Sequence, residues 1–547
     1  MSPSLIASAL LHGLLPGLLI ATNASAGAVA PLLEGMGDHH HAITTRSPEA
    51  QRYFDQGLVL AFGFNHREAA RSFRQAQALD PTCAMCLWGE ALVLGPNINA
   101  GMDAADNPRA FAAVREAVAL RGNASERERA YIEALAMRYA DPAPQDRSGL
   151  ERAYAEAMGE VVQRFPDDAD AASLYAEALM DTTPWDYWEA DGSPKPVTRT
   201  VLGTLEAVLD SQPEHPLANH LYIHAVEKVH PRRGLAAADR LRDLVPGAGH
   251  LVHMPGHIYI RVGRYDDAVR ANEKAIGADN AYVAQCHAQG LYPVAYMPHN
   301  HHFLAAAAGF IGRGDQALAA ARHMQSNQDE QLMRKPEFAT LQQYWVMPYF
   351  VMVRFGRWDE LLAEPAPADD LLYPTGIWHY ARGLAEARQF ELDAARRSLA
   401  ALTDIADDPE MGATRIWETN TMAQILAIAR AVLAGEIAMQ DCQPELAAEH
   451  FRSAVALEDA LTYVEPPDWY VPARHNLGEA LLASDQPAAA EAVYREDLSI
   501  YPANGWSLRG LEQALRKQGR HDEADAVNGR FRKVWAADGP AIAGSRL

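Results

Sequence analysis

Histidine is concentrated in one part of this chain. Eleven of its 21 histidines lie between His215 and His302. His220 and His224 are four residues apart, and Glu227 follows three residues later. Residues three or four apart lie on one face of a helix, so these side chains would point in the same direction. Two imidazoles with a nearby carboxylate on a helix face commonly bind a transition metal.

Similar spacings recur in the next two segments of the chain. The residues that we predict as metal ligands are His220, His224, Glu227, His250, His253, His257, His299 and His302. One tetrahedral ion needs fewer ligands than this, so either two ions bind, or one ion is surrounded by histidine–carboxylate pairs. Imidazole suits copper, zinc and iron, and we expect one of these as the cofactor.

The elements that position these histidines are predicted by a repeat. In the first copy, Gly57 and Ala69 are small, Phe73 is apolar, and Pro81 ends the unit because proline cannot continue a helix. This spacing resembles the tetratricopeptide repeat, in which two antiparallel helices form each unit. Further copies carry Gly256 with Ala268, Gly312 with Ala317, Gly383 with Ala395, Gly478 with Ala490, and Gly519 with Ala524. The fold class predicted is all-α, a TPR-like α-solenoid.

The repeat register gives the histidines a common orientation. His250, His253 and His257 fall at positions that usually face the concave groove of such a solenoid, and the other predicted ligands align with them. Pro255 lies within the same predicted helix, where it would cost about 3 kcal/mol without compensation. That helix therefore either begins late, near Pro255, or is kinked.

Three segments interrupt the helical pattern with proline, glycine or aromatic residues. They are 94–99, 181–194 and 465–470, and we predict loops there. Long loops in a compact array are often functional, although these aromatic residues could equally fill gaps between repeats.

Motifs spread over nearly the whole chain resemble a family of bacterial tetratricopeptide-repeat proteins, many of which carry signal peptides. The matching motifs are Tyr53–Gly57, Cys83, Cys86, Gly95–Asn99, Asn219-His220, Ile223–Glu227, Pro246–His250, His253-Met254-Pro255, Pro298-His299-Asn300, Glu465-Pro466-Pro467, Trp469-Tyr470 and Asn504–Leu508. The resemblance implies the repeat fold and export from the cytoplasm. It implies no catalytic residues.

The chain begins with an apolar stretch, Leu5 to Ile20, followed by the small residues Ala24-Ser25-Ala26. This order predicts a signal peptide over 1–26, although no Lys or Arg precedes the stretch. A membrane anchor is the alternative. We expect a histidine-containing segment at 27–47, a continuous solenoid at 48–547 with its histidine-rich centre at 215–302, and a periplasmic or secreted location.

The formal charge of −23 is unfavourable for nucleic acid and for anionic lipid surfaces. We therefore expect no nucleic-acid partner and no stable membrane insertion. Of four cysteines, Cys83 and Cys86 could form a disulfide in an oxidising compartment, or bind zinc or copper.

Three functions fit these features. The first is a metalloprotein with its site in the concave groove, acting on a small-molecule substrate as a metal-dependent oxidoreductase or hydrolase. The second is a scaffold whose groove binds a peptide or a partner protein. The third is metal storage or delivery in the cell envelope.

Overall fold

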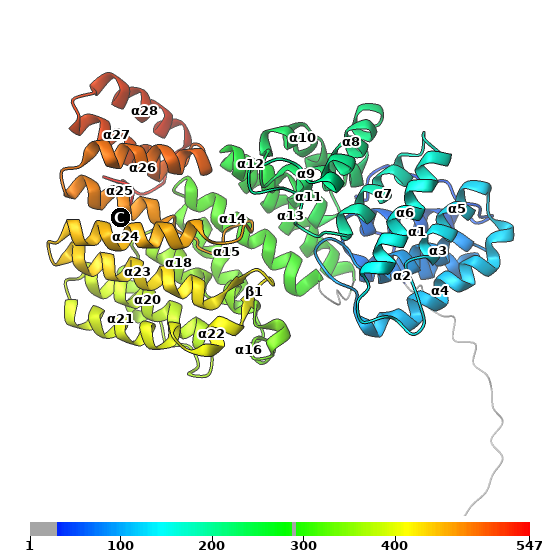
Figure 1. The fold of residues 1–547 in the computed structure, drawn as a ribbon, viewed down its shortest axis with the longest axis horizontal. Coiled ribbons are helices and arrows are strands. Elements are labelled where there is room, and N and C mark those ends of the chain that lie inside the picture. Colours follow the sequence, from blue (N-terminus) through cyan, green and yellow to red (C-terminus); the bar gives the residue numbers. More distant parts are fainter. Residues whose placement is uncertain (1–29, 287–291) are drawn as a thin grey trace, which may run out of the picture.

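The computed structural model describes residues 30–286 and 292–547, and nearly all of its regular structure is helical (Figure 1). The predicted signal peptide lies outside the described residues. The only strands within the described part form one short hairpin, β1 (Arg415–Ile416) with β2 (Asn420–Thr421). The chain therefore has the predicted all-α, TPR-like solenoid fold.

Helices α1–α8 form the N-terminal part of the array. Their bounds are Pro48–Phe62, His66–Leu79, Ala84–Leu94, Asn107–Leu120, Glu126–Ala136, Ser148–Arg164, Ala169–Asp181 and Pro196–Ser211. The central part comprises α9 (Pro216–Val226), α10 (Leu235–Leu244), α11 (Gly249–His253), α12 (Pro255–Val262), α13 (Tyr265–Gln285), a π-helical turn (Tyr292–Tyr296), α14 (Met297–Phe310) and α15 (Gly314–Ser326).

Helices α16–α28 form the C-terminal part. Their bounds are Glu330–Met333, Leu341–Trp345, Met347–Arg354, Trp358–Ala363, Leu372–Arg388, Leu392–Ala406, Pro409–Ala413, Met422–Gln440, Pro444–Asp459, Ala473–Ala483, Pro487–Ile500, Gly505–Lys517 and His521–Val534. Short 3-10 turns lie at Ala104–Asp106, Arg121–Asn123, Pro231–Gly234 and Pro336–Phe338.

In the first repeat, the ring of Phe73 occupies the space beside two glycines. A Cβ atom added at Gly57 of α1 would lie 2.8 Å from the ring of Phe73 of α2, and one added at Gly89 of α3 would lie 2.4 Å away. Because each ring fills the space that a side chain would need, glycine allows three successive helices to pack closely.

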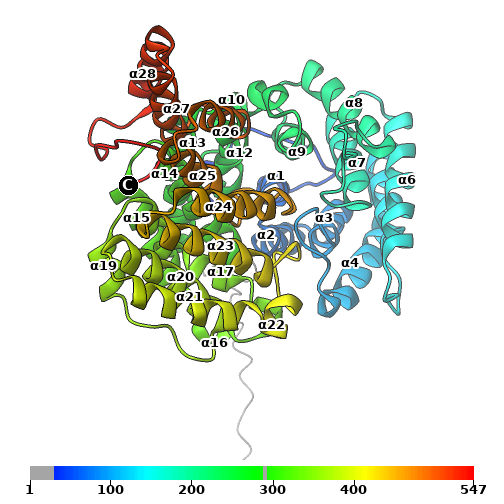
Figure 2. The same ribbon diagram turned by 60° about the vertical axis from the view of Figure 1, so that its left-hand side comes forward.

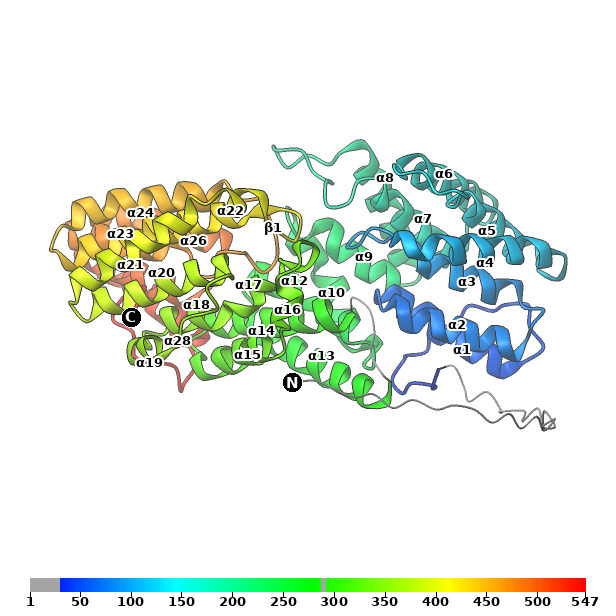
Figure 3. The same ribbon diagram turned by 90° about the horizontal axis from the view of Figure 1, so that it is seen from below.

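The array is curved, so its N-terminal end meets its centre. Figure 2 shows α1 close to α9, and residues of these two helices are in contact. Seen from below in Figure 3, α13 runs beside α14 at the centre of the molecule. The curvature brings residues of the first helix pair onto the histidine-rich centre.

The structure confirms the three predicted loops. They separate α3 from α4, α7 from α8, and α24 from α25. Cys83 and Cys86 form a disulfide, in agreement with the structural alternative for this pair. Helix α23 is long and apolar enough to span a membrane by length and composition, but 61% of its apolar window is buried against neighbouring helices.

Candidate metal centre

The predicted ligands come from four helices of the central part. His220 and His224 lie on α9, which ends next to Glu227, while His250 and His253 lie on α11 and His257 on α12. His299 and His302 lie on α14. The helical path is interrupted at Met254, and Pro255 occupies the first position of α12, where a missing N–H is tolerated. Pro255 therefore lies in a first turn, as the late-starting alternative predicted, and a separate short helix, α11, precedes it and carries His253.

The repeat register predicted that these side chains line an open groove. In the structure they do not. All of the predicted ligands except the half-buried His299 are at most 3% exposed. The N-terminal helix pair covers them, because the turn between α1 and α2 places the ring of Phe64 4.6 Å from that of His220. The site is an interior cluster of the curved array.

The first group of ligands comprises His220, His224 and His250, whose nitrogens lie within 4.8 Å of one another. His220 Nδ1 donates a hydrogen bond to the carbonyl oxygen of Phe62 at 2.6 Å. His224 Nδ1 donates to Glu227 Oε1 at 2.8 Å. The proton of each neutral ring is therefore on Nδ1, and each Nε2 keeps a lone pair that has no hydrogen-bond partner. Neither ring nitrogen of His250 has a partner.

The second group comprises His253, His257 and His299. Asn272 Nδ2 donates to the carbonyl oxygen of Ala268, so Asn272 Oδ1 accepts from His253 Nδ1 at 2.7 Å. His257 Nδ1 donates to Glu227 Oε2 at 2.5 Å. The remaining nitrogens, His253 Nε2 and His257 Nε2, both carry lone pairs and face each other at 3.0 Å.

Two facing lone pairs require a cation. Two imidazoles bound tetrahedrally to one zinc ion, at about 2.0–2.1 Å each, have their nitrogens roughly 3.3 Å apart. The distance of 3.0 Å between His253 Nε2 and His257 Nε2 is close to this value. A proton on His257 Nε2, donated to His253 Nε2 and balanced by the Glu227 carboxylate, would satisfy the pair too. The separation of the two nitrogens therefore fits either a bound metal ion or a shared proton.

Glu227 links the two groups without belonging to either. It is fully buried, and its two oxygens accept from His224 and His257. Burial would raise its pKa, but the charge of His257 and the hydrogen bonds from His224 and His257 lower it to about 2. An ionised carboxylate that holds the outer nitrogen of a ligating histidine fixes the ring and increases its basicity.

The other imidazoles of the cluster are kept neutral by burial. Desolvation lowers the pKa of His220, His250 and His299 well below its usual value, and neighbouring histidines lower it further. Neutral imidazole is the form that binds metal.

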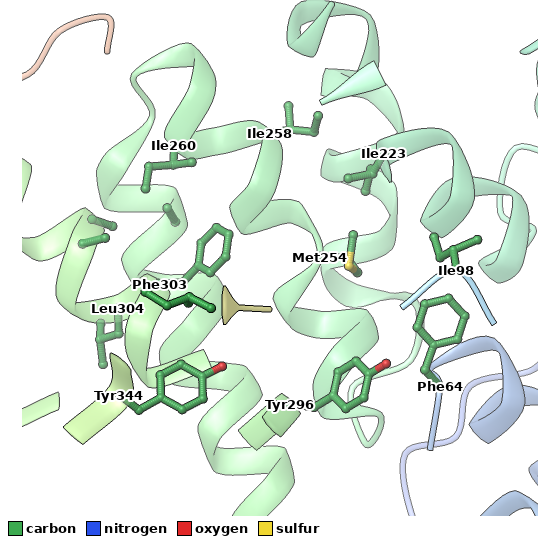
Figure 4. Packing of buried hydrophobic residues seen from close by; sticks show 14 of the residues in the cluster. Phe64, Ile98, Ile223, Met254, Ile258, Ile260, Tyr296, Phe303, Leu304 and Tyr344 are labelled. Carbon is green, nitrogen blue, oxygen red and sulfur yellow. The ribbon is translucent and has the colours of Figure 1, made fainter. Parts of the chain in front are cut away.

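Apolar and aromatic side chains surround both groups. Figure 4 shows part of this packing: Phe64 and Ile98 lie together on one side, Phe303 lies on the other, and Met254 and Tyr296 lie between them. Two of the predicted loops contribute directly. Loop 94–99 supplies Ile98, and the ring of Trp185 from loop 181–194 lies 5.1 Å from that of His224.

The third loop approaches the site through Glu465. Tyr463, just before this loop, donates to Glu465 Oε2 at 2.9 Å and lies 3.5 Å from Glu227 Oε2. All three loops thus contribute to the surroundings of the cluster. They do more than fill gaps between repeats, which was the alternative interpretation of their aromatic residues.

Not every candidate joins the cluster. His302 is buried beside the ring of Tyr344, outside both groups. Tyr222 of α9 and Tyr259 of α12 point away from the cluster and donate to the partly exposed carboxylates of Glu206 and Asp239.

The sequence did not predict a second cluster beside the first. His39, His41 and His215 surround Asp170, a residue that no motif had indicated. The triplet at 39–41 was visible in the sequence, but its partner lies 129 to 131 positions further along the chain.

Comparison with known proteins finds no matching family model and no matching curated protein. Among solved structures, a monomeric mutant of IFIT1 with Gppp-AAAA is 12% identical, covers 89% of this chain and 91% of its own, and gives a TM-score of 0.32. The human IFIT1 dimer with m7Gppp-AAAA is 12% identical, covers 90% of this chain and 91% of its own, and gives a TM-score of 0.31. The TPR domain of P58(IPK) is 12% identical, covers 86% of this chain and 98% of its own, and gives a TM-score of 0.22. Values this low say nothing about the ligand of this chain, and the expected absence of nucleic acid stays a prediction.

Proposed function

We propose that this protein is a metalloprotein that holds two transition-metal ions inside its solenoid. His220, His224 and His250 bind one ion, and His253, His257 and His299 bind the other. The observation that carries the proposal is the pattern of hydrogen bonds: four rings have their Nδ1 protons engaged, so that each directs an Nε2 lone pair into the cluster. In a purely structural core, each hydrogen-bond acceptor would face a donor. In this core, several Nε2 acceptors lie together without donors.

The ligand set favours copper or zinc over the other metals. Imidazole nitrogen suits zinc, copper, iron and nickel, and copper binds most tightly among the divalent ions. Both oxygens of Glu227 are engaged by histidines, so the two proposed ligand groups offer imidazole nitrogen and not the carboxylate oxygen that magnesium and manganese prefer.

We propose further that the ions act on a small molecule. Three protein ligands leave a fourth position, which catalytic zinc sites keep for water or substrate. A small pocket reaches His250 and is lined by Leu60, Asn65, Gly249, Asp279, Tyr282 and Tyr292. Hydrolysis with zinc or oxidation with copper would both fit such a site. Storage or delivery of metal is the alternative, and turnover of a substrate distinguishes the two.

Export to the periplasm or the exterior belongs to the same proposal. Its support is the apolar segment near the start of the chain and the Cys83–Cys86 disulfide, since disulfides persist mainly in oxidising compartments.

The test of the metal assignment compares two histidines of one helix. His299→Gln should remove one of two bound ions, whereas His302→Gln should retain both, because His302 lies outside the groups. Metal content per chain, measured by elemental analysis after gel filtration, reads out the result. Equal metal content in the two variants would refute the assignment of His299.

A further inference from the structure

Residues 30–47 cross the N-terminal part of the array as an extended strap. At its start, Leu33 N donates to Gln56 Oε1 at 2.7 Å and Gln56 Nε2 donates to the carbonyl oxygen of Pro31 at 2.9 Å, which fixes the strap to α1. At its end, Thr45 Oγ1 donates to Asp80 at the end of α2. The strap thus begins and ends on the first helix pair.

Between these points the strap contacts the loop that precedes α11. Gly247 N donates to the carbonyl oxygen of Gly35 at 2.8 Å. Gly35 has a positive φ of 75°, and a Cβ atom at Gly247 would lie 2.3 Å from the carbonyl oxygen of Glu34. Only glycine permits this approach of two backbones. His250, a ligand of the first ion, follows three residues after Gly247.

The strap is fixed across the array by a histidine knot, comprising His39, His41 and His215 around Asp170. Asp170 Oδ1 accepts from His39 Nε2 at 3.0 Å and from His215 Nε2 at 3.1 Å, and Oδ2 accepts from His41 Nδ1 at 2.7 Å. Burial alone would raise the pKa of Asp170, but these hydrogen bonds hold it well below its usual range.

The knot has the composition of a metal site, but the proton of His215 is placed differently from those of the main cluster. His215 Nδ1 accepts from the backbone N–H of Ala218 at 3.2 Å, so the ring proton is on Nε2 and is donated to Asp170. A metal at Nε2 would need a proton on Nδ1, opposite the N–H of Ala218. Hydrogen bonds within the knot therefore satisfy its polar groups without a metal, and the knot holds the strap against the array.

The knot also contacts the residue that orients His220. The ring of Phe62 lies 5.3 Å from that of His39 and 6.0 Å from that of His215, while its carbonyl oxygen accepts from His220 Nδ1. The strap therefore contacts the positions that set two ligands of the first ion. Among the described residues, it makes no hydrogen bond to α12 or α14, which carry His257 and His299 of the second group, while the third member, His253, shares α11 with His250.

We propose that the strap and its histidine knot position the ligands of the first ion, so that release of the strap weakens that ion more than the second, which shares only α11 with it. This inference rests on the proposed two-ion site. Asp170, His39 and His41 are positioning residues, which act through Phe62 and the loop before His250.

The test is a zinc titration of the metal-free full chain, in competition with a chromophoric chelator. In Asp170→Asn, the carboxamide can accept through one oxygen only, and its amino group faces a histidine N–H. We expect the affinity of one equivalent of zinc to fall about 10-fold or more, as for other residues that hold a ligand in place, with a clearly smaller change in the second. A purely structural loss would weaken both equally.

The matched control is Asp497→Asn. Asp497 is a buried aspartate that accepts from His475, Asn504 and Ser507 in the C-terminal repeats, far along the chain from the knot. It should leave both zinc affinities unchanged. If Asp170→Asn does not fold, His41→Gln removes one knot contact from the strap alone.

The outcomes separate the two proposals. If the wild type binds two ions and Asp170→Asn binds both with wild-type affinity, the proposed role of the strap is overturned and the metal site stands. Wild type without any ion overturns the metal site. In that case, hydrogen exchange decides the strap: faster exchange at Gly247 and at 249–254 in Asp170→Asn upholds the positioning of this region, and unchanged exchange overturns it.

Discussion

At the scale of single residues, the proposed metal function depends on the tautomers of the histidines. Glu227 holds His224 and His257 with their protons outward and their lone pairs inward. The Phe62 carbonyl and Asn272 do the same for His220 and His253. The same residue type in the knot has the opposite arrangement at His215. Histidine content alone therefore does not identify a metal site, and the partner of each outer nitrogen does.

Glu227→Gln tests this account. The amide oxygen can accept from one imidazole, but the amide N–H₂ must face the other Nδ1–H, so one ring loses its orientation. We expect metal affinity to fall about 10- to 100-fold, with the helical content unchanged. Competition titration and circular dichroism measure the two quantities. The control is Glu206→Gln, whose carboxylate accepts from Tyr222 and Arg233 at the surface. Wild-type affinity in Glu227→Gln would contradict the linking role.

At the scale of elements, the turn between α1 and α2 is what closes the cluster. Phe64 has a positive φ of 56° and is 3% exposed against His220, His224 and His250. Phe390, in the turn between α20 and α21, has a similar φ of 62° but is 73% exposed. The two phenylalanines thus have similar backbone φ angles but differ in burial, which makes Phe390 a matched control for Phe64.

We expect Phe64→Ala to lower the free energy of unfolding by about 3–5 kcal/mol, as for other buried phenylalanines, and to speed the loss of metal to a chelator. Phe390→Ala should change both little, because it buries little surface. Chemical denaturation and chelator-release kinetics give the two readouts. Similar losses in both variants would mean that the turn backbone, and not the packed ring, matters at position 64.

The sequence predicted much of the element arrangement. Repeated small residues determine helix pairing locally, since Gly57 and Phe73 are close in sequence, and this is why the solenoid and its register were predictable. The loops were predictable because proline and glycine disfavour helices wherever they occur. The burial of the site was not predictable in the same way. It depends on contacts such as that of Phe62 with His220, separated by 158 positions, which no local pattern encodes.

At the scale of the whole molecule, the curvature of the repeat array encloses the histidine cluster in the interior. An open solenoid would present His220 and His253 to solvent, but here both are buried, His220 beside the ring of Phe64 and His253 beside that of Phe303. A buried pair of cations is costly unless ligands and charge compensate it, and Glu227 supplies one negative charge next to both groups. The net charge of −23 further favours uptake of cations.

The central claim is that the histidine cluster is a two-ion metal site, and the metal content of the wild-type protein tests it most directly. The protein should be purified without a histidine tag, stripped with a chelator, reloaded separately with copper and zinc, and analysed for metal per chain. The account predicts about two tightly bound equivalents, together with a higher melting temperature than that of the stripped protein, because a ligand that binds the folded state stabilises it. Reloaded protein with no stoichiometric metal and an unchanged melting temperature would contradict the account.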